Sequence, residues 1–297
     1  MCLAAHSELL SSSAFAKEMR LLDYAKNVYS QSGEDGIIAK ILETLATNDK
    51  WCVEFGAWDG RHLSNSCNLI ENSGYSAVLI EGDPIRANDL RQRHAANPKI
   101  SVSNKFVGFG RNDGLDSMLA QSAIPRDFDF LSIDIDGNDY HVWKAVENYT
   151  PKVVCIEYNP TIPTEVQFVQ SPDPSVNQGS SLLSLTLLAR EKNYQLVAVT
   201  PLNAIFVQAQ YFSLFGISRN EPATLREDSS AVAQIFCGYD GTIFIAGQKH
   251  LLWHNIPYQS RIRQLPPIFR SYPGNFGASK AFLYRTYQKF CNLLKKG

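Results

Sequence analysis

Three features that would narrow the function at once are missing from this sequence. Its six cysteines never stand in C-x-x-C spacing, so the sequence favours neither a zinc ribbon nor a thioredoxin-like redox site. No apolar stretch approaches the roughly 20 residues that a membrane-spanning helix needs. The formal net charge of -1 gives the whole chain no bias towards nucleic acid or an acidic surface.

The sequence also lacks internal repeats and low-complexity tracts. Residues 1–10 are too few and too polar for a secretory signal peptide, and the cysteines are scattered as in proteins of a reducing compartment. We therefore expect a cytoplasmic protein. Its 297 residues, 44% hydrophobic and 19% charged, fit one large globular domain or one domain with an elaborated end.

Short apolar runs alternate with helical stretches from residue 51 to residue 207, a pattern typical of an α/β fold with a parallel sheet covered by helices. We expect strands at 51–55, 77–80, 100–107, 128–133, 153–156, 195–199 and 204–207. Helices are expected at 34–45, 63–72, 85–95, 115–120, 140–147 and 181–192.

The last two strands are joined by only four residues, 200–203. A crossover to a parallel neighbour needs a dozen or more residues, so the final strand should run antiparallel to its predecessor. We expect a helical N-terminal extension (1–28), a seven-stranded Rossmann-like domain (29–210) and a C-terminal extension (211–297). The last of these ends in a helix at 279–296, and residues 160–178 read as a long loop of the kind that forms lids.

A glycine turn follows the first expected strand. Gly56 and Gly60 could let the backbone approach a ligand, but their Gly-x-x-x-Gly spacing departs from the dinucleotide fingerprint. Glu54 would repel a phosphate and suits the ammonium of a methionine group. Glu81 ends the second strand, where an acid can accept both hydroxyls of a ribose. The alternative is an ordinary surface turn at each position.

Acidic residues follow the fourth and fifth strands. Asp134, Glu157 and Asn159 should meet at the carboxyl edge of the sheet and form an oxygen-rich site suited to magnesium or calcium. Such a cation could lower the pKa of a substrate hydroxyl. The alternative is that residues 136–139 only cap the next helix. His141 on that helix is a candidate general base or simply a packed side chain.

Five motifs occur in order: YSQSGEDG at 29–36, VEFGAWDG at 53–60, LIEGDP at 79–84, SIDIDGNDY at 132–140 and CIEYNP at 155–160. Together they resemble the FkbM-like branch of class I methyltransferases. The resemblance implies S-adenosylmethionine as methyl donor, with Glu54, Gly56 and Gly60 at its methionine portion and Glu81 at its ribose. It also implies that Gln31 and Glu34 close over the cofactor.

Members of this branch act on sugars, so the resemblance further implies O-methylation of a saccharide hydroxyl. In related magnesium-dependent O-methyltransferases, acids at the positions of Asp134 and Glu157 bind the metal. The predicted cofactor-binding set is Gln31, Glu34, Glu54, Gly56, Asp59, Gly60, Glu81, Gly82, Asp83 and Asp134. The predicted catalytic set is Asp134, His141 and Glu157, and the predicted metal ligands are Asp134, Glu157 and Asn159.

Two other classes remain open. An NAD-dependent oxidoreductase or epimerase shares the acid at the second strand but is disfavoured by the glycine spacing and by Glu54. A non-catalytic scaffold would retain the fold and use the basic, amphipathic C-terminal end to dock on a partner or a membrane surface. The sequence predicts a small-molecule or saccharide acceptor and no nucleic-acid partner, and it leaves the possibility of a homo-oligomer open.

Overall fold

The computed structural model describes residues 19–46, 49–240, 242–257, 266–270 and 275–293. The strands of the main sheet are β1 (Trp51–Phe55), β2 (Ser76–Glu81), β3 (Ile100–Asn104), β4 (Phe130–Ile133), β5 (Val153–Glu157), β6 (Tyr194–Val199) and β7 (Asn203–Gln208). The helices around it are α1 (Glu34–Leu45), α2 (Cys67–Ser73), α3 (Pro84–His94), α4 (Leu115–Leu119), α5 (Asp139–Ala145) and α6 (Leu182–Glu191).

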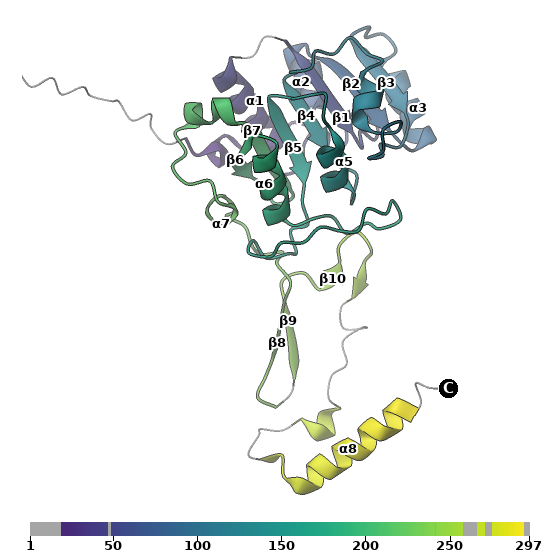
Figure 1. The fold of residues 1–297 in the computed structure, drawn as a ribbon, viewed down its shortest axis with the longest axis vertical. Helices are drawn as coiled ribbons and strands as arrows, with labels where there is room; N and C mark the ends of the chain where they lie inside the picture. The colour runs from purple at the N-terminus through teal and green to yellow at the C-terminus, as the bar shows by residue number, and fades with distance from the viewer. Residues whose placement is uncertain (1–18, 47–48, 241, 258–265, 271–274, 294–297) are drawn as a thin grey trace, which may run out of the picture.

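These seven strands form one sheet in the order β3-β2-β1-β4-β5-β7-β6 (Figure 1). Neighbours from β3 to β5 are parallel. The strand β7 lies between β5 and β6 and is antiparallel to both. The predicted Rossmann-like sheet with an antiparallel last strand is therefore confirmed. The connection between β6 and β7 is too short for a crossover, so these two strands form a hairpin.

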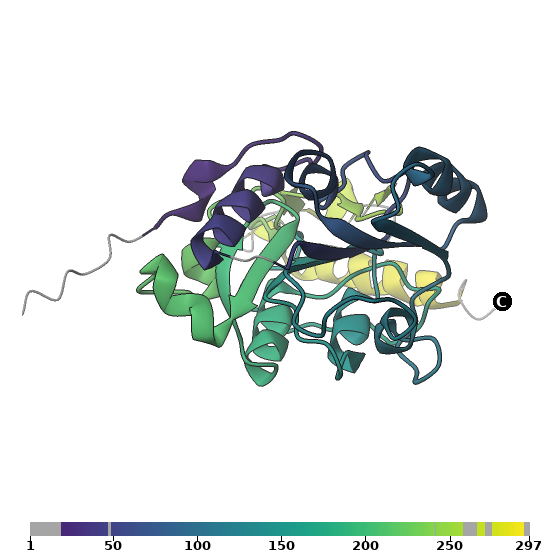
Figure 2. The ribbon, with the colours of Figure 1, turned by 90° about the horizontal axis from the view of Figure 1, so that it is seen from above.

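Both faces of the sheet are covered by helices. Figure 2 shows α1, α2 and α3 on one side and α4, α5 and α6 on the other. Successive strand residues point to opposite faces, so Cys52 and Leu79 pack under the first layer while Val53 and Ile80 pack under the second. Burial on both faces is why the strands read as continuous apolar runs.

Two elements of the sheet domain have a boundary that differs from the prediction by three residues or more. The helix expected from residue 63 begins at Cys67, because Leu63 has a left-handed φ of 56° and the turn after it binds the carboxylate of Glu54. The strand expected to reach residue 107 ends at Asn104, whose side-chain amide donates to the Glu81 carbonyl at 2.8 Å. Tertiary hydrogen bonds therefore override local propensity at both places.

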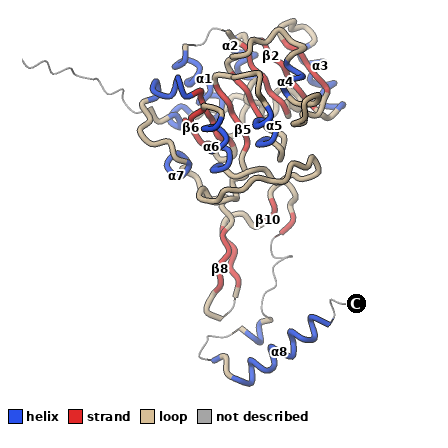
Figure 3. Tube along the Cα trace, in the orientation of Figure 1, coloured by secondary structure: helices blue, strands red, loops and turns tan. Residues whose placement is uncertain are grey.

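The C-terminal extension contains more β-structure than its sequence suggests. Figure 3 shows two small hairpins and a terminal helix in it. The elements of the extension are α7 (Pro222–Leu225), β8 (Gln234–Cys237), β9 (Ile243–Ala246), β10 (His250–Leu251), β11 (Ile256–Pro257), η4 (Pro267–Phe269) and α8 (Ala278–Leu293), and the hairpins are β8–β9 and β10–β11. The helix expected at 279–296 is thus present over the described residues.

Short 3-10 helices flank the sheet domain at η1 (Leu21–Tyr24) and η2 (Ala209–Phe215). Of the helical extension expected at 1–28, residues 1–18 lie outside the described part of the chain, and η1 is what the remainder contains. Within the described residues, no helix combines the length and apolar character needed to cross a membrane.

Candidate functional site

A cavity of about 1030 Å³ opens at the carboxyl edge of the parallel strands. Its walls come from the segments that follow β1 to β5, which is where ligands bind in open α/β sheets. The loop expected to act as a lid contributes Pro174 and Asn177, and the C-terminal extension contributes Trp253. Gln31 lines another part of the wall, and its role in closing over a cofactor stays a prediction.

The two glycines of the β1 turn have packing reasons for being glycine. Gly56 has φ 76°, and a Cβ there would lie 1.7 Å from the carbonyl oxygen of Asp134. Gly60 has φ 71°, and its Cβ would lie 2.4 Å from Leu90 of α3. Gly56 lines the cavity, whereas Gly60 is not among its lining residues. The turn is therefore shaped by close contacts with the residue that follows β4 and with α3, independently of any ligand.

Glu54 lies at the cavity wall, but its carboxylate is already engaged. One oxygen accepts from the hydroxyls of Ser64 at 2.6 Å and Ser66 at 2.7 Å, and the other accepts from the backbone N–H of Asn65 at 2.8 Å. Burial raises the pKa of Glu54, and the two serine hydroxyls oppose that rise. Glu54 thus organises the turn before α2, a role that the sequence did not indicate.

Glu81 stands at the end of β2 and also lines the cavity. Its two oxygens accept from the backbone N–H groups of Trp58 at 2.8 Å and Asp83 at 2.7 Å, which fixes the carboxylate in place. Asp83 in turn caps α3 by accepting from the N–H of Ile85 and the N–H of Arg86. Glu81, Gly82 and Asp83 all line the cavity, and their role in cofactor binding stays a prediction.

Aromatic groups that the sequence did not single out surround Glu81. Phe106 is 81% exposed, lines the cavity and covers Gly82, where a Cβ would lie 2.4 Å from its ring. The guanidinium carbon of Arg86 lies over the indole ring of Trp58, 3.1 Å from the ring centroid. Trp58 itself has a left-handed φ of 49°. An exposed ring above a glycine is a flat apolar platform suited to a planar ligand.

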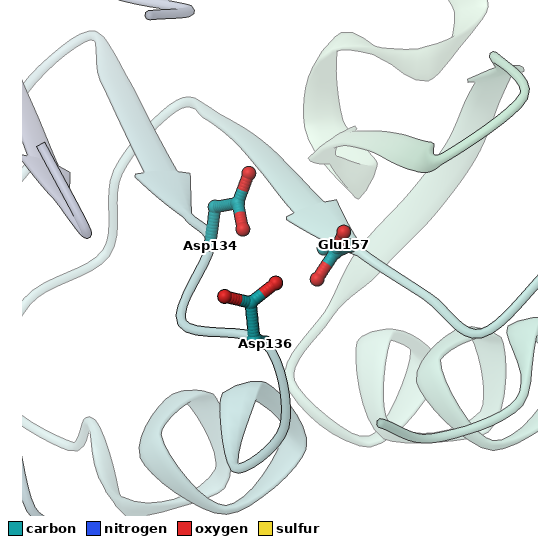
Figure 4. A group of neighbouring side chains, drawn as sticks. All are labelled: Asp134, Asp136 and Glu157. Atoms are coloured by element: carbon teal, nitrogen blue, oxygen red, sulfur yellow. The ribbon is translucent and has the colours of Figure 1, made fainter. Parts of the chain in front are cut away.

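Three carboxylates converge at the centre of the carboxyl edge. Figure 4 shows Asp134 and Asp136 from the turn after β4 pointing towards Glu157 at the end of β5. One oxygen from each lies within 4.8 Å of the others, and Oε2 of Glu157 is buried with no hydrogen-bond partner among the described residues. Asp136 reaches this position because its φ is 56°, in the left-handed region that aspartate tolerates.

The charges of these groups disfavour one another. Burial, followed by the negative charges of Asp139 and Asp136, raises the pKa of Asp134 well above its ordinary range. Burial and then Asp134 raise the pKa of Glu157 in the same way. Burial raises the pKa of Asp139 to about 6, although its oxygens accept from the N–H groups of Ile135 and Gly137. A proton or a cation would relieve this repulsion.

The side chain of Asn159 is engaged by other groups and does not line the cavity, which disfavours its predicted role as a metal ligand. Its side-chain oxygen accepts from the N–H and hydroxyl of Thr161, and its amide donates to the Gln178 carbonyl at 2.7 Å. Asn159 therefore fastens both ends of the long loop. Asp136, which was not predicted as a ligand, lies with Asp134 and Glu157.

Three other predicted site residues are not among those lining the cavity. Glu34 is fully buried and accepts from Thr200 Oγ1 at 2.6 Å and from Asn203 at 3.1 Å, so it joins α1 to the β6–β7 hairpin. Asp59 accepts from two backbone N–H groups of its own turn. His141 has Nε2 at 2.8 Å from the Gln170 carbonyl and holds the long loop.

No family model matches the sequence. No curated protein matches it either. Among solved structures, the fold resembles the N-terminal domain of EvdMO1 with SAH bound, at 9% identity over 60% of this chain and 82% of that chain, with a TM-score of 0.41.

Two further solved structures are named as methyltransferases. One is the magnesium protoporphyrin IX methyltransferase of Synechocystis PCC 6803 with bound SAM, at 7% identity over 59% of this chain and 77% of that chain, with a TM-score of 0.37. The other is a SAM dependent methyltransferase of Aquifex aeolicus, at 11% identity over 57% of this chain and 87% of that chain, with a TM-score of 0.34. None of these matches supports the FkbM-like branch in particular, which stays a prediction.

Proposed function

We propose that the protein is an S-adenosylmethionine-dependent methyltransferase. The observation that carries the proposal is Glu81, held at the cavity wall with acceptor capacity to spare. Each of its oxygens accepts one backbone N–H, from Trp58 or Asp83, and a carboxylate oxygen has two lone-pair sites. The remaining sites suit the two hydroxyls of a ribose, a contact that adenosine-containing cofactors make at this strand end.

The neighbourhood of Glu81 also suits the adenine ring. Phe106 offers an exposed aromatic face one strand further along the same edge, next to Gly82. Stacking on such a face buries both surfaces without requiring a particular set of polar partners. We therefore assign the adenosine half of the cofactor to the β2–β3 end of the cavity.

The other half of the cavity is lined by acidic groups. Glu54, Asp134, Asp136 and Glu157 all line it. The methionine end of the cofactor carries an ammonium and a sulfonium group, and both positive charges are favoured there. The pyrophosphate of a nicotinamide cofactor would meet the same carboxylates and be repelled, which disfavours the oxidoreductase alternative.

The carboxylate group also suits a divalent cation. Oxygen donors are the ligands that magnesium and calcium prefer, and Oε2 of Glu157 is a buried acceptor with no hydrogen-bond partner among the described residues. Asp134, Asp136 and Glu157 would hold the ion, with Asn159 excluded because it binds the loop. When bound, the ion would lower the pKa of an acceptor hydroxyl so that its oxygen can accept the methyl group.

We propose a saccharide hydroxyl as the acceptor. This step rests on the motif resemblance and on the room that the cavity offers, because about 1030 Å³ exceeds what a single ligand of cofactor size needs. Trp253 and Asn177 lie on the wall contributed by the extension and the long loop. They would position the acceptor beside the carboxylates.

The test compares S-adenosylhomocysteine binding to the wild type, to Glu81→Gln and to Glu43→Gln by titration calorimetry. Glu43 is an exposed residue of α1 that pairs only with Lys40 among the described contacts and serves as the matched control. Losing hydrogen bonds to a charged group costs roughly 1.5–3 kcal/mol each, so Glu81→Gln should weaken binding by about tenfold or more. Unchanged affinity of Glu81→Gln in a folded protein would contradict the assignment.

A further inference from the structure

The C-terminal extension carries a charge opposite to that of the rest of the chain. Residues 251–297 hold eight basic side chains and no acidic one, whereas residues 1–250 hold 20 basic and 29 acidic side chains, a formal charge of -9. The near-neutral total conceals this asymmetry. The basic residues are Arg261, Arg263, Arg270, Lys280, Arg285, Lys289, Lys295 and Lys296.

The helix α8 presents large apolar side chains to solvent. Phe282 is 69% exposed, Leu283 is 54% exposed and Phe290 is 59% exposed. At 100° per residue these three share one stripe of the helix. Arg285 and Lys289 are also exposed and follow one border of that stripe, so cations and apolar groups form a single amphipathic surface.

A different side of α8 is already occupied. The rings of Tyr284 and Tyr287 pack on the ring of Phe269 in η4, with centroid distances of 5.6 and 5.5 Å. The ring of Tyr284 also lies beside that of Phe276, with a centroid distance of 6.4 Å. Phe269 is buried by these contacts. They orient the helix so that Phe282 and Phe290 remain outside, and the exposure of the stripe is therefore fixed by packing.

The helix stands off from the sheet domain (Figure 1). The β8–β9 hairpin extends in the same direction and is also apolar, with Phe236 and Phe244 stacked at 5.2 Å and Tyr239 84% exposed. Large apolar groups that gather on one projecting part of a protein mark an interaction surface. The extension as a whole thus presents apolar groups and positive charge at one end of the molecule.

We propose that α8 docks on an anionic lipid surface and lies in the plane of the interface. The helix has the features of an interfacial helix, with aromatic and aliphatic residues on one face and lysine and arginine beside them. Lipid headgroups would bind the cations while the acyl boundary receives Phe282, Leu283 and Phe290. Nucleic acid would bind the cations but leave that apolar stripe in water.

The test is sedimentation of the full chain with vesicles of phosphatidylcholine alone or of phosphatidylcholine mixed with phosphatidylserine. We expect binding to the mixed vesicles, with a partition coefficient that falls as salt is added, because screening weakens the attraction between the cations and the headgroups. Equal binding to both vesicle types, or no binding to either, would overturn the proposal.

Variants separate the two halves of the surface. Neutralising Lys280, Arg285 and Lys289 to glutamine should lower the partition coefficient by roughly a hundredfold, since each basic residue near an anionic surface contributes about a factor of five. The matched control neutralises Arg91, Arg111 and Arg190, three exposed residues of the sheet domain, and should bind as the wild type does. Equal loss in the control would show attraction by general charge and refute a docking role for α8.

A second set keeps the proposal testable if the neutral variant unfolds the helix. Lys289→Arg retains the charge and should retain binding, whereas Phe282→Ser with Phe290→Ser should lose most of it while circular dichroism stays unchanged. Light scattering and a duplex-DNA binding assay complete the test. A stable dimer or DNA complex that needs α8, in a protein that ignores anionic vesicles, would assign the surface to that partner instead.

Discussion

Replacing Asp134 with asparagine should make the stability of the protein less dependent on pH. Burial and neighbouring carboxylates raise the pKa of Asp134 and Glu157 well above the ordinary carboxyl range, and burial raises that of Asp139 from 3.8 to about 6. A group whose folded pKa is raised binds its proton more tightly when folded. The stability it confers is therefore present at low pH and is lost as pH rises through the folded pKa.

The size of the effect follows from the geometry. At a separation of 4.8 Å and an effective dielectric constant of about 20, two negative charges repel by roughly 3.5 kcal/mol. Protonation of one carboxylate removes its repulsion with its neighbour. We therefore use the repulsion between one pair of carboxylates as the size of the whole effect. For a domain of this size, each kcal/mol shifts the unfolding temperature by about 2–4 °C. These groups should thus lower the unfolding temperature of the wild type by roughly 7–14 °C above their folded pKa values, relative to its value below them.

Scanning calorimetry of the protein without added metal, at about pH 5 and about pH 8, measures this difference. Asp134→Asn should reduce the fall in unfolding temperature, whereas Asp127→Asn, a change at an exposed residue, should match the wild type. Magnesium at the higher pH should raise the unfolding temperature of the wild type much more than that of Asp134→Asn. Identical pH profiles for the wild type and Asp134→Asn would refute the account of the carboxylate group.

Three further predictions concern residues around the site. Gly56→Ala should destabilise the fold by about 3 kcal/mol or more in urea unfolding, because its Cβ would meet the Asp134 carbonyl at 1.7 Å; an unchanged midpoint would contradict this. Glu34→Gln should cost about 1–3 kcal/mol yet leave S-adenosylhomocysteine affinity unchanged, and a large loss of affinity would restore its predicted role in cofactor binding. His141→Gln should increase proteolysis of the long loop, since it disturbs the contact with Gln170, without moving the pH profile of methyl transfer; a shifted profile would instead indicate a general base.

Much of the fold could be predicted because strand burial and connection length are local properties of the sequence. The short connection expected between the last two strands, residues 200–203, was enough to predict an antiparallel last strand. The convergence of Asp134 and Glu157 was also predictable, because carboxyl ends of adjacent parallel strands meet at one edge. Glu81 reached the cavity for the same reason.

Other features depend on conformations and contacts that spacing does not encode. Asp136 joins the carboxylates only through a left-handed turn, and Asn159 leaves them because Thr161 and Gln178 take its side chain. Gly60 looked like part of a ligand turn, but Leu90 of a helix 30 residues later explains it. The position of Trp253 depends on how the whole extension folds back to the cavity.

The central claim is that the cavity binds the adenosine and methionine parts of S-adenosylmethionine. Calorimetric titration of the wild-type protein with S-adenosylhomocysteine, compared with NAD under the same conditions, tests it most directly. We expect saturable binding of one S-adenosylhomocysteine per chain and no heat from NAD, because Glu54 and the carboxylate group repel its pyrophosphate. Binding of NAD without binding of S-adenosylhomocysteine would contradict the account.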